Sequence, residues 1–247
     1  MNLLLTPVKS LLNKLGLYPF ARTIYRKISP LHRRDCVNNK SFFASIISDG
    51  DLCFDIGANV GQTIEALVAI NARVVAIEPN PNCIPVLNYQ FKNNPNVTIL
   101  QIAMGASASK AKLNFTGTES TASMRDDWPF PNEQTIEVEL STLDNLIAEY
   151  GRPKLIKVDV EGFELDVFKG LNQAVPLIYF EMHGNEFNEA LNILNRLSAI
   201  GEVVGVKVIS GDNSSWLINE WVNIDDIAVK LSNQLPHYAN IIVKMKV

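Results

Sequence analysis

The chain has 247 residues, of which 47% are hydrophobic and 19% are charged. This composition provides a sizeable core and excludes an intrinsically disordered chain. The length is typical of one α/β domain with short additions. The formal net charge of −4 argues against broad nucleic-acid binding, which needs a basic surface.

The cysteines and the absence of targeting features predict a cytoplasmic protein. Cys36, Cys53 and Cys83 form no CxxC pair, and their odd number favours small buried thiols in a reducing compartment. The leucine-rich start is interrupted by Lys9 and Lys14, far short of the ~20 apolar residues that a membrane-spanning helix needs. It also lacks the basic start and clean apolar stretch of a signal peptide.

Charge separates the N-terminal segment from the rest of the chain. Residues 1–34 carry seven basic residues and no acidic one, so the other 15 of the 22 basic residues share the remaining chain with all 26 acidic residues. We predict a basic helical extension over residues 1–40 and one domain over residues 41–247. The seven basic residues are Lys9, Lys14, Arg22, Arg26, Lys27, Arg33 and Arg34.

Two helices are expected in the extension. Thr6 and Pro7 suit the N-cap and first residue of a helix that Gly16 ends, and a second short helix is expected over residues 20–27. The segment packs on the sheet, contacts another subunit, or lies on an anionic membrane surface. Packing is the favoured interpretation, because amphipathic helices usually turn their apolar face to a protein core.

From residue 51 onward, short apolar runs alternate with helical patterns, which predicts a parallel, doubly wound sheet. Strands are expected over residues 52–56, 74–77, 97–102, 155–158, 177–180, 203–208 and 241–245. Helices are expected over residues 61–70, 81–91, 142–150, 163–171 and 187–197, and an inserted β pair over residues 113–115 and 136–140. Residues 116–134 are polar and lack periodicity, which favours a lid or binding loop over the alternative of disorder.

The turn after the first predicted strand reads Gly57-Ala58-Asn59-Val60-Gly61, with Asp55 just before it. Small residues let a backbone approach a ligand closely as a strand turns into a helix. Asp55 can hold this turn or accept a hydrogen bond from a ligand amine. Glu78 follows the second strand, where an acid commonly accepts hydrogen bonds from ribose hydroxyls. An ordinary tight turn and a solvated strand-end charge are the alternatives.

Three further candidates follow the fourth and fifth strands. Asp159 and Glu161 can orient a hydroxyl, accept its proton or hold a divalent ion, although we assign no metal. Alternatively, Asp159 positions backbone and Glu161 caps the next helix. His183 has an unperturbed pKa of ~6.5, which suits a general base, and its alternative is a loop histidine bonded to Glu181.

Five motifs resemble the FkbM-type methyltransferases over about residues 42–183. The resemblance implies an α/β, Rossmann-like class I methyltransferase fold. Its mixed sheet would have seven strands, the seventh antiparallel, with helices on both faces. It also implies S-adenosylmethionine (SAM) as methyl donor and a hydroxyl oxygen as acceptor. The motifs are Asp55–Gly61, Glu78–Pro81, Ala103–Gly105, Thr142–Asp144 and Lys157–Glu164.

Carried over by position, the resemblance implies roles for single residues. Gly57, Asn59 and Gly61 would line the methionine part of the cofactor and Glu78 would bind the ribose. Asn80 and Ala103 would flank the adenine, and Asp159 would lie near the methyl group. Substrate choice is expected in the terminal regions, where no comparable motif occurs.

The expected activity is therefore SAM-dependent O-methylation of a sugar, glycan or secondary metabolite. The residues after the fourth strand lack the Asn/Asp-Pro-Pro-Tyr/Phe cluster that is common in enzymes methylating amino groups of bases. Two alternatives stay open: a nicotinamide-dependent oxidoreductase or epimerase, and a catalytically silent SAM-binding scaffold. Trp216 and Trp221 lie before the last strand, and their rings stack on an acceptor or pack in the core. The sequence makes no prediction of oligomeric state.

Overall fold

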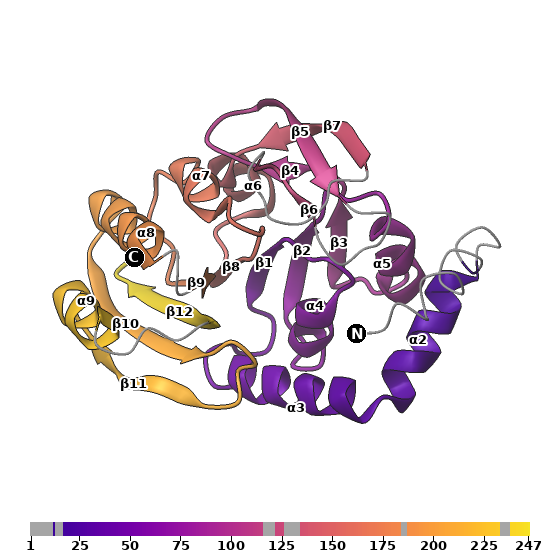
Figure 1. Cartoon of the computed structure of the whole chain (residues 1–247), viewed down its shortest axis with the longest axis horizontal. Coiled ribbons are helices and arrows are strands. Elements are labelled where there is room, and N and C mark those ends of the chain that lie inside the picture. Colours follow the sequence, from indigo (N-terminus) through magenta and orange to yellow (C-terminus); the bar gives the residue numbers. More distant parts are fainter. Residues whose placement is uncertain (1–11, 13–16, 116–121, 126–133, 184–186, 233–237) are drawn as a thin grey trace.

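The computed structural model describes residues 12, 17–115, 122–125, 134–183, 187–232 and 238–247. Its centre is an eight-stranded sheet with the order β11-β10-β12-β9-β8-β1-β2-β3 (Figure 1). The strands β1, β2, β3, β8 and β9 run parallel to one another. They comprise Leu52–Ile56, Arg73–Ile77, Val97–Leu100, Leu155–Val158 and Leu177–His183.

The far half of the sheet is antiparallel. β12 (Tyr238–Met245) runs antiparallel to both β9 and β10 (Val203–Ser210), which confirms the expected antiparallel last strand. The described sheet has eight strands instead of the predicted seven, because Trp216–Val222 forms the edge strand β11. β11 pairs antiparallel with β10, with register shifts between Val206 and Ile209.

Helices cover both faces of the sheet, as predicted. One core packs α6 (Leu143–Tyr150), α7 (Glu164–Lys169), α8 (Phe187–Ile200) and α9 (Ile224–Ser232) on one face. A second core packs α3 (Pro30–Ala44), α4 (Gln62–Val68) and α5 (Ile84–Phe91) on the other. In the first core, Phe168 and Phe180 meet edge to face with their ring centroids 5.7 Å apart.

A second, smaller sheet extends the predicted β pair. Its order is β4-β7-β5-β6, in which β5 (Ser109–Phe115) and β7 (Gln134–Ser141) pair antiparallel. The short strands β4 (Ala103–Met104) and β6 (Ala122–Ser123) flank them. Most of the predicted lid over residues 116–134 lies outside the described residues.

The N-terminal segment packs against the domain through both apolar and polar contacts. α2 (Tyr18–Ile28) contacts α5, and α3 passes through residue 40 without a break. The buried Arg26 donates from Nη1 to the carbonyl of Val60 (2.7 Å) and to Oε1 of Gln90 (2.8 Å). Arg26 thus joins α2 to the turn after β1. The helix predicted to end at Gly16 lies outside the described residues, except for Leu12.

Arg26 also lies beside a cluster formed by His32, Cys36 and Glu65, whose ligand atoms are close enough to share a metal ion. Its Nε donates to His32 Nε2 (3.0 Å), and its Nη2 lies 2.7 Å from Glu65 Oε2. The guanidinium therefore already supplies positive charge to this cluster.

Within the described residues, no helix has the length and apolar character needed to cross a membrane.

Candidate active site

The register of the parallel strands brings the predicted motifs together. Ile56 is opposite Ile77 on β2 and opposite Val158 on β8, so the residues that follow each of them lie side by side. The amide of Gly57 donates to the carbonyl of Ile77 (2.9 Å), and the amide of Asp159 donates to that of Ile56 (3.0 Å). Gly57, Glu78 and Asp159 therefore meet at the carboxyl edge of the sheet.

The two glycines of the turn are required by close packing. Gly57 has φ +79°, and a Cβ built there would lie 1.8 Å from the carbonyl oxygen of Asp159. Gly61 has φ +83°, and its Cβ would lie 2.4 Å from the Phe91 ring. Close approach to a ligand was the predicted reason for small residues here. The described contacts are with Asp159, directly after β8, and with α5, and they lock the turn in one conformation, whereas close approach to a ligand stays a prediction.

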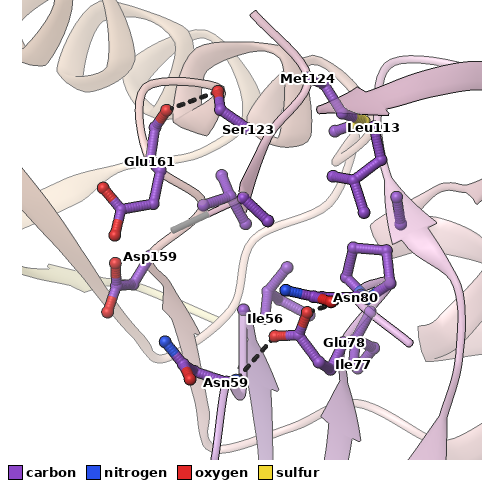
Figure 2. A pocket seen from close by; sticks show the side chains of 15 residues that line it. Ile56, Asn59, Ile77, Glu78, Asn80, Leu113, Ser123, Met124, Asp159 and Glu161 are labelled. Atoms are coloured by element: carbon purple, nitrogen blue, oxygen red, sulfur yellow. Dashed lines mark hydrogen bonds between the residues drawn. The ribbon is translucent and has the colours of Figure 1, made fainter. Parts of the chain in front are cut away.

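Glu78 holds the turn with both carboxylate oxygens. Its Oε2 accepts the backbone N–H of Asn59 (2.7 Å) and its Oε1 accepts that of Asn80 (2.8 Å) (Figure 2). Burial raises the pKa of Glu78 to about 7, although the two backbone hydrogen bonds oppose the shift. Each oxygen keeps acceptor capacity for a further donor.

Asn80 offers a donor to the pocket. Its Oδ1 accepts the N–H of Asn82 (3.0 Å), which orients the amide group. Its Nδ2 is buried and has no hydrogen-bond partner among the described residues, and it points into the pocket in Figure 2. A buried donor without a partner is costly, so this atom is suited to a ligand acceptor.

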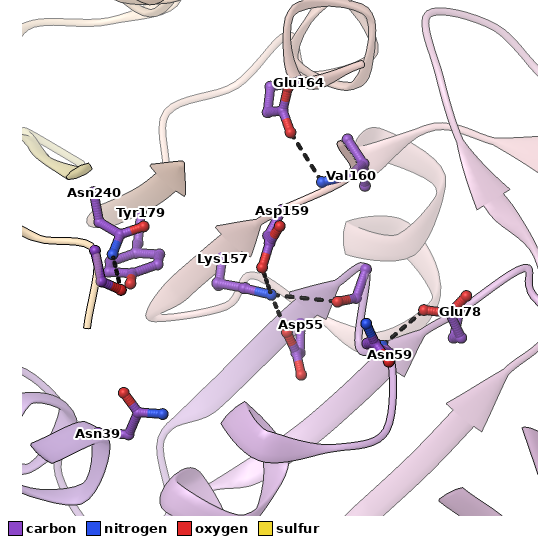
Figure 3. Close-up of polar contacts among 12 residues, drawn as sticks. Asn39, Asp55, Asn59, Glu78, Lys157, Asp159, Val160, Glu164, Tyr179 and Asn240 are labelled. Carbon is purple, nitrogen blue, oxygen red and sulfur yellow. Dashed lines mark hydrogen bonds and ion pairs between the residues drawn. The ribbon is translucent and has the colours of Figure 1, made fainter. Parts of the chain in front are cut away.

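Lys157 is a site residue that the sequence reasoning missed. Its buried ammonium lies 3.3 Å from Asp55 Oδ1 and 3.0 Å from Asp159 Oδ2, and it donates to the carbonyl of Gly57 (3.3 Å) (Figure 3). Burial alone would lower the pKa of Lys157, but Asp159 and Asp55 raise it above its usual value. The signal was the alternation Lys157-Val158-Asp159, which puts both side chains on one face of the strand.

Asp55 lies beneath the site. It is fully buried, and burial raises its pKa against the opposing charge of Lys157. Asp55 does not line the pocket, and its described contact is the ion pair with Lys157, which in turn donates to the carbonyl of Gly57.

Glu161 is held in an unusual backbone conformation across the pocket. Its φ is +57°, which is uncommon for a residue with a side chain. Its carbonyl accepts the hydroxyl of Ser123 (2.9 Å), and Glu164 accepts the amides of Val160 (2.9 Å) and Gly162 (3.3 Å) on either side. Burial and the charges of Asp159 and Glu181 raise the pKa of Glu161 to about 8.

The structure gathers seven of the ten predicted site residues around one pocket. The small sheet closes its upper wall with Ala103, Leu113 and Ser123. Asp55 and Gly61 do not line the pocket. The side chain of His183, at the end of β9, lies outside the described part of the chain. The seven are Gly57, Asn59, Glu78, Asn80, Ala103, Asp159 and Glu161.

Trp216 and Trp221 do not line this pocket. The Lys207 ammonium lies 4.9 Å from the ring centroids of both, and Trp216 packs against Phe42 in the core with centroids 5.9 Å apart. Packing therefore describes Trp216, whereas Trp221 is 39% exposed, and stacking of these rings on an acceptor stays a prediction.

The strand order, the antiparallel β12 and a pocket at the carboxyl edge define the class I methyltransferase fold. The chain belongs to the FkbM methyltransferase family: the family model, described as the methyltransferase FkbM domain, matches residues 55–202, more than half of the chain.

Two curated relatives carry related names. The chain is similar to the hexuronic acid methyltransferase AglP of Haloferax volcanii, with 29% identity covering 53% of this chain and 54% of that protein. It is also similar to the methyltransferase sdnD of Sordaria araneosa, with 27% identity covering 62% of this chain and 70% of that protein. The match thus spans about half the length of AglP.

Solved structures of low identity resemble the chain. A precorrin-6y C5,15-methyltransferase from Geobacter metallireducens has a TM-score of 0.44 at 13% identity, covering 85% of this chain and 87% of that one. A TehB-like SAM-dependent methyltransferase from Corynebacterium glutamicum has a TM-score of 0.45 at 11% identity, covering 85% and 88%. The fold assignment rests on the strand order and not on these scores.

Proposed function

We propose that this protein is a SAM-dependent O-methyltransferase that acts on a hydroxyl of a sugar, glycan or secondary metabolite. The observation that carries the proposal is the polar pattern of one pocket. Glu78 and the unpartnered Nδ2 of Asn80 lie on one side, and Asp159 and Glu161 lie on the other (Figure 2). Membership of the FkbM family supports the reaction type.

The pocket residues fit this cofactor. The carboxylate of Glu78 suits ribose hydroxyl donors, and Asn80 Nδ2 suits an acceptor nitrogen of adenine. Gly57 and Asn59 would hold the methionine part beside the turn, and Ala103 would flank the adenine. When bound, SAM supplies a methyl carbon activated by its sulfonium sulfur.

The chain would contribute alignment and removal of one proton. Alignment of the reacting groups contributes ~7–11 kcal/mol in well-oriented systems. The acceptor hydroxyl would receive the methyl group that bound SAM supplies, S-adenosylhomocysteine would be the other product, and the hydroxyl proton would pass to a base of the pocket. We assign the role of general base to Glu161, because its raised pKa suits a proton acceptor. Asp159 is less suited, because Lys157 holds it in an ion pair. A role for His183 stays a prediction.

The proposed acceptor class is supported by the name of one relative. AglP is named for a hexuronic acid, which supports a sugar acceptor, whereas sdnD is named only as a methyltransferase. A cytoplasmic location also stays a prediction, and Cys36, Cys53 and Cys83 are all free thiols in the structure.

The test is transfer of radiolabelled methyl from SAM to a panel of neutral sugars, uronic acids and oligosaccharides. We expect label in at least one acceptor, at an oxygen. Label on nitrogen would overturn the O-methylation, and SAM binding without transfer to any of them would favour the silent scaffold. The nicotinamide-dependent alternative finds no support in the family match.

Binding of the product S-adenosylhomocysteine should tighten as pH rises through about 7. Only ionised Glu78 accepts hydrogen bonds with both oxygens, and it loses its charge below its pKa of about 7. We expect an affinity roughly tenfold higher at about pH 8 than at about pH 6. Calorimetry should show a weaker, pH-independent affinity in Glu78→Gln. The exposed Glu202→Gln is the matched control, and an unchanged pH dependence in Glu78→Gln would contradict the assignment.

A further inference from the structure

The helix α2 exposes an apolar face of the kind that an ordinary surface helix buries. Its buried side carries Tyr18, which packs in a small apolar cluster with Val60, Cys83 and Val86, and the charged Arg26. Its other side leaves four large apolar side chains between 44% and 64% exposed, spaced three or four residues apart. We call these the α2 apolar face: Leu17, Phe20, Ile24 and Ile28.

This orientation is fixed by the contacts of Arg26. The guanidinium reaches Val60, Gln90, Glu65 and His32 at 2.7–3.0 Å, and it is 5% exposed. Rotating α2 to bury its apolar face would leave the Glu65 carboxylate without this cation and expose the cation itself. The exposed apolar face is therefore a built feature of the surface.

The α2 apolar face continues onto α5. The rings of Phe20 and Tyr89 meet edge to face with centroids 6.4 Å apart, and Tyr89 is also exposed. A tyrosine beside apolar side chains suits a boundary between water and hydrocarbon, because its ring is apolar and its hydroxyl polar. In Figure 1, α2 lies at the edge of the molecule, away from the α8 and α9 side of the sheet.

The charge of the residues around the α2 apolar face indicates which kind of surface it contacts. Residues 1–34 carry seven basic residues and no acidic one, whereas the rest of the chain has 15 basic and 26 acidic residues. An anionic surface attracts the first part and repels the second, which orients the molecule with α2 toward that surface. A second copy would bring the same basic segment against itself, because a two-fold interface is made of the same patch on both subunits.

We infer that the α2 apolar face docks on an anionic phospholipid membrane, with the apolar side chains entering the boundary between headgroups and acyl chains and the net positive charge of residues 1–34 attracted to the headgroups. The packing of α2 that was expected from the sequence and a membrane contact then coexist on opposite sides of one helix. This inference does not depend on the proposed methyl transfer.

The test is flotation of the full chain with vesicles of phosphatidylcholine alone or mixed with phosphatidylglycerol. We expect binding to the anionic vesicles, weakened by salt, and at least tenfold weaker binding in Ile24→Glu/Ile28→Glu. The matched control is Val204→Glu/Leu217→Glu, which places the same charges at exposed apolar positions of β10 and β11 and should bind like the wild type. Thermal unfolding checks that each variant is folded.

Two results would overturn the inference. One is a wild-type chain that does not float with anionic vesicles. The other is a dimer in light scattering that Ile24→Glu/Ile28→Glu converts to a monomer without any loss of vesicle binding, which would assign the patch to a second copy.

Discussion

Gly57→Ala should lower the free energy of unfolding by about 3 kcal/mol or more and abolish S-adenosylhomocysteine binding. The new methyl group would lie 1.8 Å from the carbonyl oxygen of Asp159, a backbone atom that cannot rotate away. The turn after β1 or the end of β8 must move, and both carry pocket residues. Chemical denaturation measures the first effect and calorimetry the second.

Gly50→Ala is the matched control for this variant. Gly50 has the same φ of +79° as Gly57, but a Cβ there would meet nothing within 4 Å. The loss of stability in Gly50→Ala therefore measures only the cost of placing alanine at a positive φ, which we expect to be about 1 kcal/mol. Equal losses of stability in the two variants would show that the contact with Asp159 has no cost, and that the turn is less tightly locked than described.

Glu161→Gln should lower kcat by about 10²–10³-fold while leaving S-adenosylhomocysteine affinity within about twofold. Glutamine keeps the shape of the side chain and cannot take a proton. The backbone contacts that Ser123 and Glu164 make around this position do not involve the Glu161 side chain, so the loop should stay in place. The methyl-transfer assay with an accepted sugar measures kcat.

The pH profile separates Glu161 from its neighbour. The wild-type rate should rise as pH rises through about 8, because only the ionised Glu161 accepts the hydroxyl proton and burial raises its pKa to about 8. Glu161→Gln should flatten this rise. Asp159→Asn is the comparison variant, and a flattened profile there with an unchanged one in Glu161→Gln would make Asp159 the base.

The fold was predictable because its signals are local and strong. The parallel strands are short apolar runs whose ends carry the motif residues, and α6 lies within the predicted helix 142–150, with Thr142 accepting the N–H of Asn145 (3.1 Å). β11 escaped prediction because alternation in an exposed edge strand is weak: only Trp216, Ile218 and Val222 pair with β10. α3 escaped because its sequence is mostly polar.

The site was predictable in its position but not in its connections. Strand register follows from burial patterns, so the meeting of Glu78 and Asp159 was foreseeable. The ammonium of Lys157 lies between two carboxylates because β8 pairs with β1 in the register that sets Lys157 opposite Asp55, and the sequence does not state which strands are neighbours. The contact of Arg26 with Val60 joins residues 34 positions apart, and no pattern within either segment encodes it.

Calorimetric titration of the wild-type chain with S-adenosylhomocysteine, and with NAD as the control ligand, tests the central claim most directly. The pocket described by Glu78 and Asn80 predicts binding of S-adenosylhomocysteine at one site and no binding of NAD. Binding of NAD alone would contradict the assignment of this pocket to a methyl donor.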